Sequence, residues 1–165
     1  MNLVAIIKIL NDLKRRKKIR DYAIFGAVGA SFYVEPTYTK DIDIIVLADT
    51  DQDYVEAWKE LRNHATRIKD FGFIIADTEV QILPTSVSPL LRSALINARV
   101  IRRGEITTKV VDKEHLILLT LKANRLKDRF RASMLLEQAN TSRLNSLLRR
   151  FDTDGALKER LKGLC

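Results

Sequence analysis

Apolar positions along the first half of the chain alternate between helix-like spacing and short continuous runs. Helical spacing in residues 3–13 predicts an amphipathic opening helix, since its apolar side chains recur every three or four positions: Leu3, Ile6, Ile7, Leu10 and Leu13. Short apolar runs at 22–25, 42–48 and 79–83 predict strands. The run at 42–48 is almost unbroken, which is typical of a central strand. We expect these three strands to form the functional sheet.

Capping and breaking residues predict helices between these strands. A helix is expected at 28–34, because Pro36 ends any helical segment there. Thr50 and Asp51 can cap a further helix, which we expect to run to about residue 69. Ser88 and Pro89 then open a helix that ends near residue 98, with proline in its first turn.

Two further pairs of short segments have strand character. Residues 73–76 precede the strand at 79–83, and Asp77-Thr78 between them is either a turn or a bulge. Residues 100–101 and 109–111 flank Gly104 and can pair as a minor hairpin.

The second half of the chain is predicted to be helical. Asp112 can cap a helix over 113–124, and helical patterning resumes at Lys127, with breaks near 140–141 and 153–155. The fold class is therefore α/β, a sheet flanked by helices with a helical cap at the C-terminal end. We expect one domain over 1–165, with the α/β core at about 1–111 and the helical part at about 112–165.

The amino-acid composition limits the classes of protein to which the chain can belong. A chain of 165 residues with 46% hydrophobic and 30% charged residues is typical of a soluble globular protein. We expect no membrane span and no signal peptide. The single cysteine is Cys165, so a disulfide framework is excluded and the cytoplasm is the expected compartment. His64 and His115 are far apart and have no cysteine nearby, which argues against zinc.

The net charge of +8 favours an anionic partner. Part of this charge lies in the basic run at 14–18, with Arg20 just beyond. Such a run is either a solvated helix end whose cations complement the helix dipole, or a contact for RNA. Aromatic residues are not interleaved with it, which argues against a surface for stacking bases.

Two carboxylates at the start of the central strand carry the strongest functional signal. Asp41 and Asp43 are two residues apart, so they project to the same side of a strand while Ile42 and Ile44 face the other way. Either the strand begins at the surface and water solvates both acids, or a cation lies between them. Hard oxygen ligands suit Mg²⁺. The small-residue turn at 26–31 could bring backbone N–H groups to phosphates.

These residues resemble the signature of the DNA-polymerase-β-like nucleotidyltransferase superfamily, within it most closely the AbiEii-type and related minimal nucleotidyltransferases. The matching residues are Gly26-Ala27 and the segment from Pro36 to Asp43, although Thr37 stands where arginine is common. A second match is the segment at 115–128, which includes Leu121-Lys122, Arg125 and Lys127-Asp128. Together the two matches span about residues 20–130.

The resemblance implies a fold and a set of roles. The sheet would be the mixed sheet of a nucleotidyltransferase. Asp41 and Asp43 would hold Mg²⁺, or Mn²⁺ in its place, and both would be catalytic. Gly26 and Ala27 would face the phosphates, Lys122 would contact the triphosphate, and Arg125 would assist it. We expect Lys122 and Arg125 to share one helix face, Asp128 to pair with Arg125 or Arg131, and His115 to face solvent.

The third carboxylate departs from the pattern. By register, Gln81 occupies the place of the acid that acts as base, and Glu79 lies on the same face two residues earlier. We take Glu79 as the third catalytic acid, because an amide cannot accept a proton as a base does. The alternative is that Gln81 marks a chain with little transfer activity.

The sequence thus predicts a nucleotidyltransferase that transfers a nucleoside monophosphate from a nucleoside triphosphate to a hydroxyl. The resemblance implies a toxin of a toxin–antitoxin pair, with an antitoxin partner and an RNA or tRNA acceptor among the options. The alternatives are a catalytically impaired nucleotide-binding module of the same fold, and a basic nucleic-acid-binding protein.

Overall fold

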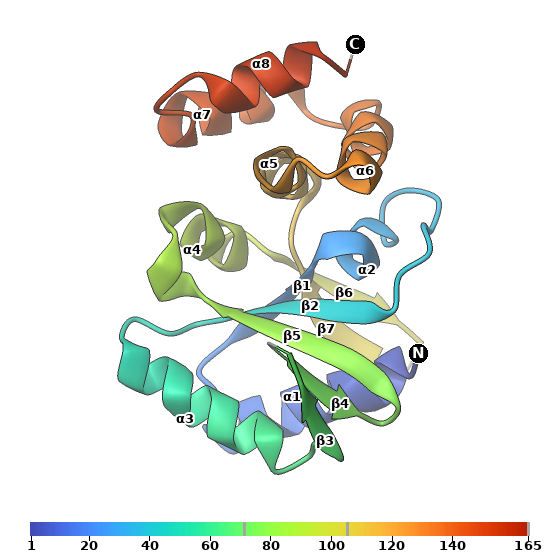
Figure 1. The fold of residues 1–165 in the computed structure, drawn as a ribbon, viewed down its shortest axis with the longest axis vertical. Coiled ribbons are helices and arrows are strands. Elements are labelled where there is room, and N and C mark those ends of the chain that lie inside the picture. The colour runs from blue at the N-terminus through green and yellow to red at the C-terminus, as the bar shows by residue number, and fades with distance from the viewer. Residues whose placement is uncertain (71, 105, 165) are drawn as a thin grey trace.

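The computed structural model describes residues 1–70, 72–104 and 106–164, which fold around a seven-stranded mixed sheet (Figure 1). Its strand order is β3-β4-β5-β2-β1-β7-β6. At the centre lie β1 (Tyr22–Phe25), β2 (Asp41–Val46) and β5 (Thr78–Pro84). β2 pairs antiparallel with β1 and parallel with β5. The three predicted strands are therefore neighbours, and β2 is in the middle of the sheet.

Two hairpins extend this central sheet on either side. β3 (Arg67–Lys69) and β4 (Gly72–Ile75) continue beyond β5, and Ala76-Asp77 form the turn into β5, both with positive φ. The segment between these strands is thus a tight turn. On the other side, β6 (Arg99–Arg103) and β7 (Ile106–Val110) form the predicted hairpin, and β7 pairs in parallel with β1.

The predicted helix over 51–69 is too long. α3 (Asp51–Arg62) begins at a capping box in which Thr50 and Asp53 bond each other's backbone N–H groups, and it ends at Arg62. Residues 67–69 are a strand because the exposed edge of β4 offers their backbone groups partners, with Ile68 opposite Phe73. Pairing in three dimensions overrides the local helical pattern there.

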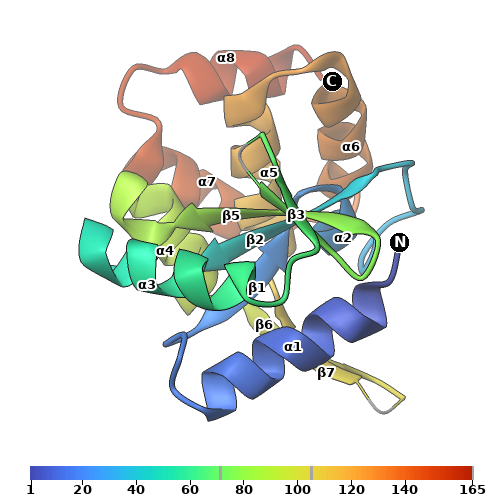
Figure 2. The same ribbon diagram turned by 60° about the horizontal axis from the view of Figure 1, so that its bottom comes forward.

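Helices cover both faces of the sheet. α1 (Leu3–Arg15) and α3 lie on one face, as Figures 1 and 2 show, and the apolar side of α1 is buried as predicted. The other face carries α2 (Gly26–Ala30), the short 3-10 helix η1 (Thr85–Val87), α4 (Pro89–Ile96) and α5 (Lys113–Ala123). The sheet therefore has a hydrophobic core on each face, and consecutive strand residues belong to different cores. Ile44 packs with α1 on one face, and Ile45 packs with α4 and α5 on the other.

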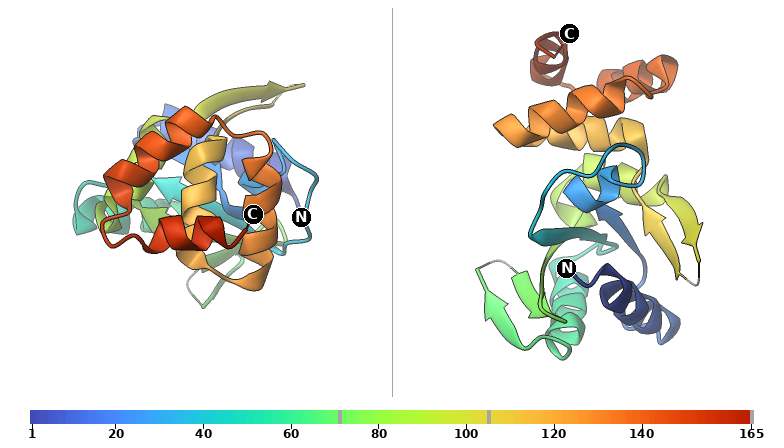
Figure 3. Two further views of the ribbon diagram at one scale, coloured as in Figure 1. Left: turned by 90° about the horizontal axis from the view of Figure 1, so that it is seen from above. Right: turned by 90° about the vertical axis from the view of Figure 1, so that its right-hand side faces the viewer.

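The C-terminal part is helical, as predicted. α6 (Leu126–Leu136), α7 (Thr141–Phe151) and α8 (Ala156–Lys162) gather with α5 into a layer over the second face of the sheet (Figure 3). Asn140 caps α7, and Gly155 precedes α8 with φ +77°, at the two predicted breaks. None of the helices in the described part of the chain combines the length and apolar character needed to cross a bilayer. Cys165, which carried the prediction about disulfides, lies outside the described residues.

Candidate active site

The site begins where β1 turns into α2 against the side chain of Asp43. Gly26 follows β1 directly and has φ +63°, a conformation that L side chains rarely adopt. A Cβ placed on Gly26 would lie 2.0 Å from Asp43 Oδ2. The carboxylate of Asp43 can therefore occupy this position only because residue 26 has no side chain.

Asp41 and Asp43 share one side of β2, as predicted. Both are half-buried, while Ile42 and Ile44 between and after them are fully buried on the other side. Burial, reinforced by the negative charge of Asp41, raises the pKa of Asp43 from its usual 3.8 to about 6. The nearby cations of Arg125, Arg131 and Lys127 oppose this rise in the pKa.

The parallel pairing of β2 with β5 places two more polar side chains beside this pair. Glu79 is opposite Asp41, and Gln81 is opposite Asp43. Gln81 Nε2 lies 3.5 Å from Asp41 Oδ2 and 3.4 Å from Glu79 Oε1. The hydroxyl of Thr39 donates to Asp41 Oδ1. The carboxylate of Asp41 is thus oriented from two sides.

Glu79 is engaged with a cation outside this cluster. Its Oε2 accepts from Lys69 Nζ at 2.7 Å, and this contact lowers the pKa of Glu79. A lowered pKa makes a carboxylate a weaker base. The cavity beside Asp43 is lined by Gln81, whereas Glu79 is not among its lining residues.

That cavity has a volume of about 550 Å³ and lies between the sheet and the C-terminal helices. One wall comes from the ends of the central strands and the turn after β1, the other from α5 and α6. It gathers most of the predicted site residues, together with two that the sequence analysis did not place in the site: Gly26, Asp43, Gln81, Lys122, Arg125, Asp128 and Arg131. Ala27 is buried, and neither Ala27 nor Asp41 lines the cavity.

Lys122 and Arg125 do not share a helix face, so that prediction is wrong. α5 ends at Ala123, and Asn124 adopts the left-handed conformation with φ +53°. Arg125 therefore caps the start of α6 instead of continuing α5. The two cations still reach the same cavity because it lies at the junction of the two helices.

Asp128 orients two arginines at this junction. Arg125 Nε donates to Asp128 Oδ2 at 2.6 Å, and Arg131 Nη1 donates to Asp128 Oδ1 at 2.9 Å. Asp128 is 1% exposed and Arg131 3%, so both charges are buried. Arg125 and Arg131 were expected as alternative partners of Asp128, and both contacts are confirmed.

Arg131 also lines the cavity, although the sequence predicted it only as a partner of Asp128. Its Nη2 lies 3.4 Å from the hydroxyl of Thr37, the position where the resembling proteins often carry arginine. Its buried Nε has no hydrogen-bond partner within the described residues. The signal in the sequence was weak, because a basic residue three positions after Asp128 is also typical of an ordinary helix surface.

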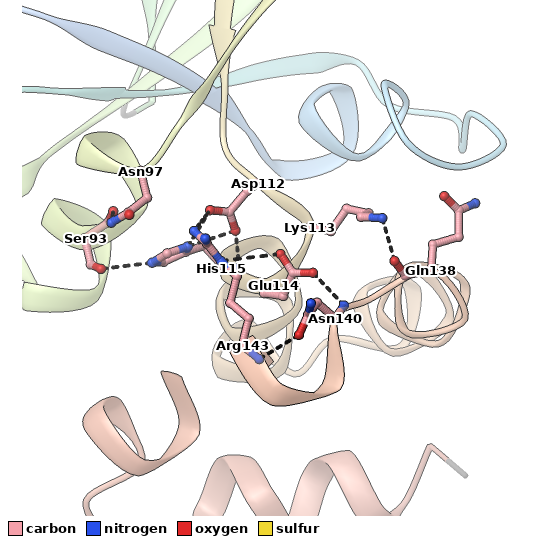
Figure 4. Close-up of polar contacts among 9 residues, drawn as sticks. All are labelled: Ser93, Asn97, Asp112, Lys113, Glu114, His115, Gln138, Asn140 and Arg143. Carbon is pink, nitrogen blue, oxygen red and sulfur yellow. Dashed lines mark hydrogen bonds and ion pairs between the residues drawn. The ribbon is translucent and has the colours of Figure 1, made fainter. Parts of the chain in front are cut away.

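A buried polar network fixes α5 to its neighbours (Figure 4). His115 is fully buried, so the prediction that it faces solvent is wrong. Its Nε2 is 2.9 Å from Ser93 Oγ on α4, and its Nδ1 is 2.9 Å from Asp112 Oδ1. Arg143 on α7 donates to Asp112 Oδ2 at 2.6 Å. The sequence pattern of the helix could not predict Ser93 and Arg143 as members of this network, because they belong to α4 and α7.

The same network includes Glu114, which is 2% exposed. Its Oε1 accepts from the backbone N–H of Asn140 at 2.8 Å, just before α7 (Figure 4). Because buried polar groups fix the relative positions of the elements that carry them, α5 is held against both α4 and α7. Lys122 therefore extends from a well-anchored helix.

The donor set fits a magnesium ion shared with phosphates. No group of three or more His, Cys, Asp or Glu side chains among residues 1–70, 72–104 and 106–164 could hold a metal by itself. Mg²⁺ is commonly bound by one or two carboxylates together with substrate phosphates. Asp41 and Asp43 provide such a pair, and the pKa of Asp43 is raised first by burial and second by the negative charge of Asp41.

Comparisons with solved structures identify the fold. The chain superposes with a TM-score of 0.59 on ANT(2″)-Ia in complex with adenylyl-2″-tobramycin, at 11% identity, covering 93% of this chain and 98% of that one. An antigenic nucleotidyltransferase-like protein from Paracoccidioides brasiliensis gives 0.56 at 14% identity, with 94% and 93% covered. A candidate nucleotidyltransferase from Thermotoga maritima gives 0.54 at 16%, with 83% and 93% covered.

These similarities establish the fold class that the resemblance implied: a mixed α/β sheet flanked by helices, as in nucleotidyltransferase-like proteins. No protein-family model matches the chain. The search of curated proteins gives no significant match either.

Proposed function

We propose that the chain is a nucleotidyltransferase that transfers a nucleoside monophosphate from a nucleoside triphosphate to a hydroxyl group. The observation that carries this proposal is the cavity at the end of β2. Asp43 lines its sheet side, with Asp41 next to it on the same side of β2, and three cations, Lys122, Arg125 and Arg131, lie on its helix side. Metal-binding carboxylates facing phosphate-binding cations across one cavity suit a bound triphosphate. The fold of the neighbouring structures supports the same class of reaction by analogy.

The reaction exchanges a phosphoanhydride bond of the triphosphate for a new phosphoester bond to the acceptor. The oxygen of the acceptor hydroxyl attacks the α-phosphorus, the bond from that phosphorus to the bridging oxygen breaks, and pyrophosphate leaves. The hydroxyl proton passes to a base or to water. Mg²⁺ held by Asp41 and Asp43 would offset the negative charge of the phosphates.

The chain's own residues would act mainly by positioning. Lys122 and Arg125 would bind the outer phosphates, and Asp128 keeps the guanidinium of Arg125 directed by a 2.6 Å contact. Gly26 lets the backbone approach the ligand without obstruction by a side chain. Glu79 remains the proposed base, and its reach to the acceptor depends on releasing Lys69.

A nucleotide-binding module without transfer activity is the second candidate. The observation that favours it is the presence of Gln81, rather than an acid, beside Asp43 in the cavity lining. An amide can donate to a phosphate or a hydroxyl but cannot accept its proton as a base. Such a module would still bind the triphosphate through the carboxylates and the cations.

A role in binding RNA through the basic run receives less support. Four of its five cations, and Arg20 beyond it, are ion-paired within the chain: Lys14 with Asp21, Arg15 and Arg16 with Asp12, Lys18 with Glu60, and Arg20 with Asp49. Paired cations have less positive potential to offer a nucleic acid. A toxin role with an antitoxin partner is the biological setting that the sequence resemblance suggests, and the acceptor in that setting would be a protein or tRNA hydroxyl.

Thermal unfolding with each of the four nucleoside triphosphates tests the proposal. A triphosphate should raise the Tm in the presence of Mg²⁺ or Mn²⁺ and should not do so without the metal. The double variant Asp41→Asn/Asp43→Asn should lose this shift. Exposed Asp77 provides a matched control, since Asp77→Asn should keep it. Equal metal-dependent shifts in the parent and the double variant would reject this site.

A further inference from the structure

A second cavity adjoins the first and shares a wall with it. It has a volume of about 620 Å³, and both cavities are lined by Ser88 and Lys122. The start of α4 and the end of α5 form one side of it, and the turn between α7 and α8 forms the other. A ligand in the second cavity would therefore lie next to a nucleotide bound in the first.

Positive charge predominates in the lining of this cavity. Its charged side chains are Lys122, Arg150 and Arg160 against the single acid Asp154. Asp154 Oδ1 accepts from the backbone N–H of Ala156 at 3.0 Å. This one carboxylate is outnumbered by the three cations of the lining.

None of these three cations has an ion-pair partner among the described residues. Arg160 Nη1 donates to the carbonyl oxygen of Leu121 at 2.9 Å, so it holds the end of α5 in place. The ammonium of Lys122 and the guanidinium of Arg150 form no ion pair within the described chain. The guanidinium of Arg150 lies 5.1 Å from the ring centroid of Phe151, which steadies it at the cavity.

We propose that the second cavity is the acceptor subsite and that the acceptor is an anion, a small hydroxyl compound that carries a phosphate or carboxylate group. This inference rests on the proposed transferase function. Arg150 would bind the anionic group, Lys122 would lie between this group and the phosphates of the nucleotide, and the hydroxyl would face the first cavity past the shared wall. The transfer is the same exchange of bonds, with pyrophosphate as the leaving group.

This chemistry contrasts with that of the structural neighbour bound to adenylyl-2″-tobramycin. Tobramycin carries several amino groups and is a polycation at neutral pH. The second cavity of the present chain would repel such a molecule, since its net charge and that of the whole chain are positive. The two proteins share a fold but would select acceptors of opposite charge.

Calorimetric titration tests the charge preference. The protein is first saturated with Mg²⁺ and the α,β-methylene analogue of whichever triphosphate binds, and is then titrated with inorganic phosphate, ribose 5-phosphate, ribose and tobramycin. We expect phosphate or ribose 5-phosphate to bind at least tenfold more tightly than ribose, and tobramycin not to bind. Absence of binding by both anions, or tighter binding of tobramycin, would overturn the proposal.

Two adjacent arginines provide a matched pair of variants. Arg150→Glu should weaken binding of the anionic probe at least tenfold, whereas Arg149→Glu, a charge reversal at an exposed residue one position away and outside the lining, should not. Neither variant should weaken binding of the triphosphate analogue more than twofold. Equal effects of the two variants on the probe, or a comparable loss of analogue binding in Arg150→Glu, would overturn the assignment.

The two proposals can fail separately. If no triphosphate analogue binds the parent chain, the transferase proposal is rejected. The anionic probes are then titrated without an analogue: binding that depends on Arg150 but not Arg149 supports an anion site in the second cavity, and no such binding rejects it.

Discussion

Gly26 lies so close to Asp43 that any side chain on Gly26 would collide with the carboxylate, since an added Cβ would lie 2.0 Å from Asp43 Oδ2. The collision involves a side chain that is itself confined by burial, so Asp43 would have to move. Gly26→Ala should therefore abolish metal-dependent triphosphate binding, measured as the loss of the Mg²⁺-dependent Tm shift. It should also destabilise the fold.

Gly104→Ala is the control for backbone strain. Gly104 has φ +58°, close to the +63° of Gly26, but nothing lies within 4 Å of an added Cβ. Both variants carry the cost of an alanine at positive φ, about 1 kcal/mol, and only Gly26→Ala adds the collision. If Gly104→Ala lost triphosphate binding to the same extent, the loss would reflect general destabilisation, and the contact with Asp43 would be irrelevant.

The pKa of Asp43 makes stability depend on pH. In the folded chain this pKa is about 6, against 3.8 normally, so the folded state retains a proton that the unfolded state releases between these values. Asp43 therefore leaves the free energy of unfolding unchanged below about pH 3.8. It lowers this free energy progressively between pH 3.8 and about 6, and the loss is complete above that pH. A shift of two units corresponds to about 3 kcal/mol.

Asp43→Asn removes that cost because the amide stays neutral. In metal-free urea unfolding at pH 8, we expect the variant to be more stable than the parent by about 1–3 kcal/mol, and the gain should shrink towards pH 4. Asp77→Asn, an exposed substitution of the same chemistry, should show no such trend with pH. A gain that is the same at both pH values would contradict the raised pKa.

The central strands and their acids could be predicted from the sequence because their signals are local. The unbroken apolar run of β2 needs no information from elsewhere, and the i, i+2 spacing of Asp41 and Asp43 places them on one side in any strand. The place of Gly26 in the site was expected from the family resemblance, because its local signal also fits a glycine that only ends a strand.

The errors arose where a distant partner decides the outcome. Residues 67–69 form a strand because they pair with the edge of β4. His115 can be buried because Ser93 and Asp112 satisfy its ring nitrogens. Arg131 joined the cavity through Asp128, at a helix junction set by the left-handed Asn124. A helical pattern in one sequence contains no information about which tertiary partners will satisfy its polar groups.

Asp128 should be important for stability as well as for binding. It forms ion pairs with Arg125 and with Arg131, which is 3% exposed, so Asp128→Asn leaves a buried guanidinium without its counterion. Breaking a buried pair from one side typically costs about 3–5 kcal/mol. We expect a loss near the lower end of that range in urea unfolding, because the amide can still accept a hydrogen bond.

Asp12→Asn is the comparison for that experiment. Asp12 also pairs with two arginines, Arg15 and Arg16, but on the exposed surface of α1. Its removal should change the unfolding free energy very little, because water screens exposed ion pairs. Similar losses in the two variants would mean that burial of the Asp128 cluster contributes nothing.

Lys122 is expected to recognise phosphate rather than the nucleoside. Its ammonium lines both cavities and has no counterion in the described structure. Lys122→Ala should weaken triphosphate binding by roughly 1.5–3 kcal/mol in calorimetry and leave nucleoside binding unchanged. Exposed Lys158 on α8, outside both linings, is the control, and Lys158→Ala should change neither affinity. Equal weakening of nucleoside and triphosphate would reject the phosphate contact.

The identity of the base separates the enzyme from the binding module. Glu79 is opposite Asp41 in the sheet but is paired with Lys69, and Gln81 is opposite Asp43 and lines the cavity. Radiolabelled triphosphates, supplied with cellular RNA and protein as acceptors, measure transfer directly. If Glu79 is the base, Glu79→Gln should slow transfer about a hundredfold, the usual scale for loss of a general base. Triphosphate binding should persist in that variant.

Gln81→Asp tests the opposite case with the same assay. If the parent is nearly inert, an aspartate at position 81 should provide a proton acceptor in the lining of the cavity. The rate of transfer should then increase. Lys69→Gln is the matched control, because it frees Glu79 without adding an acid at position 81. Faster transfer in Lys69→Gln would identify Glu79 as the base, and faster transfer in Gln81→Asp alone would identify a binding module that lacks one. A parent and variants that bind triphosphate and remain inert with all four nucleotides would reject the transferase.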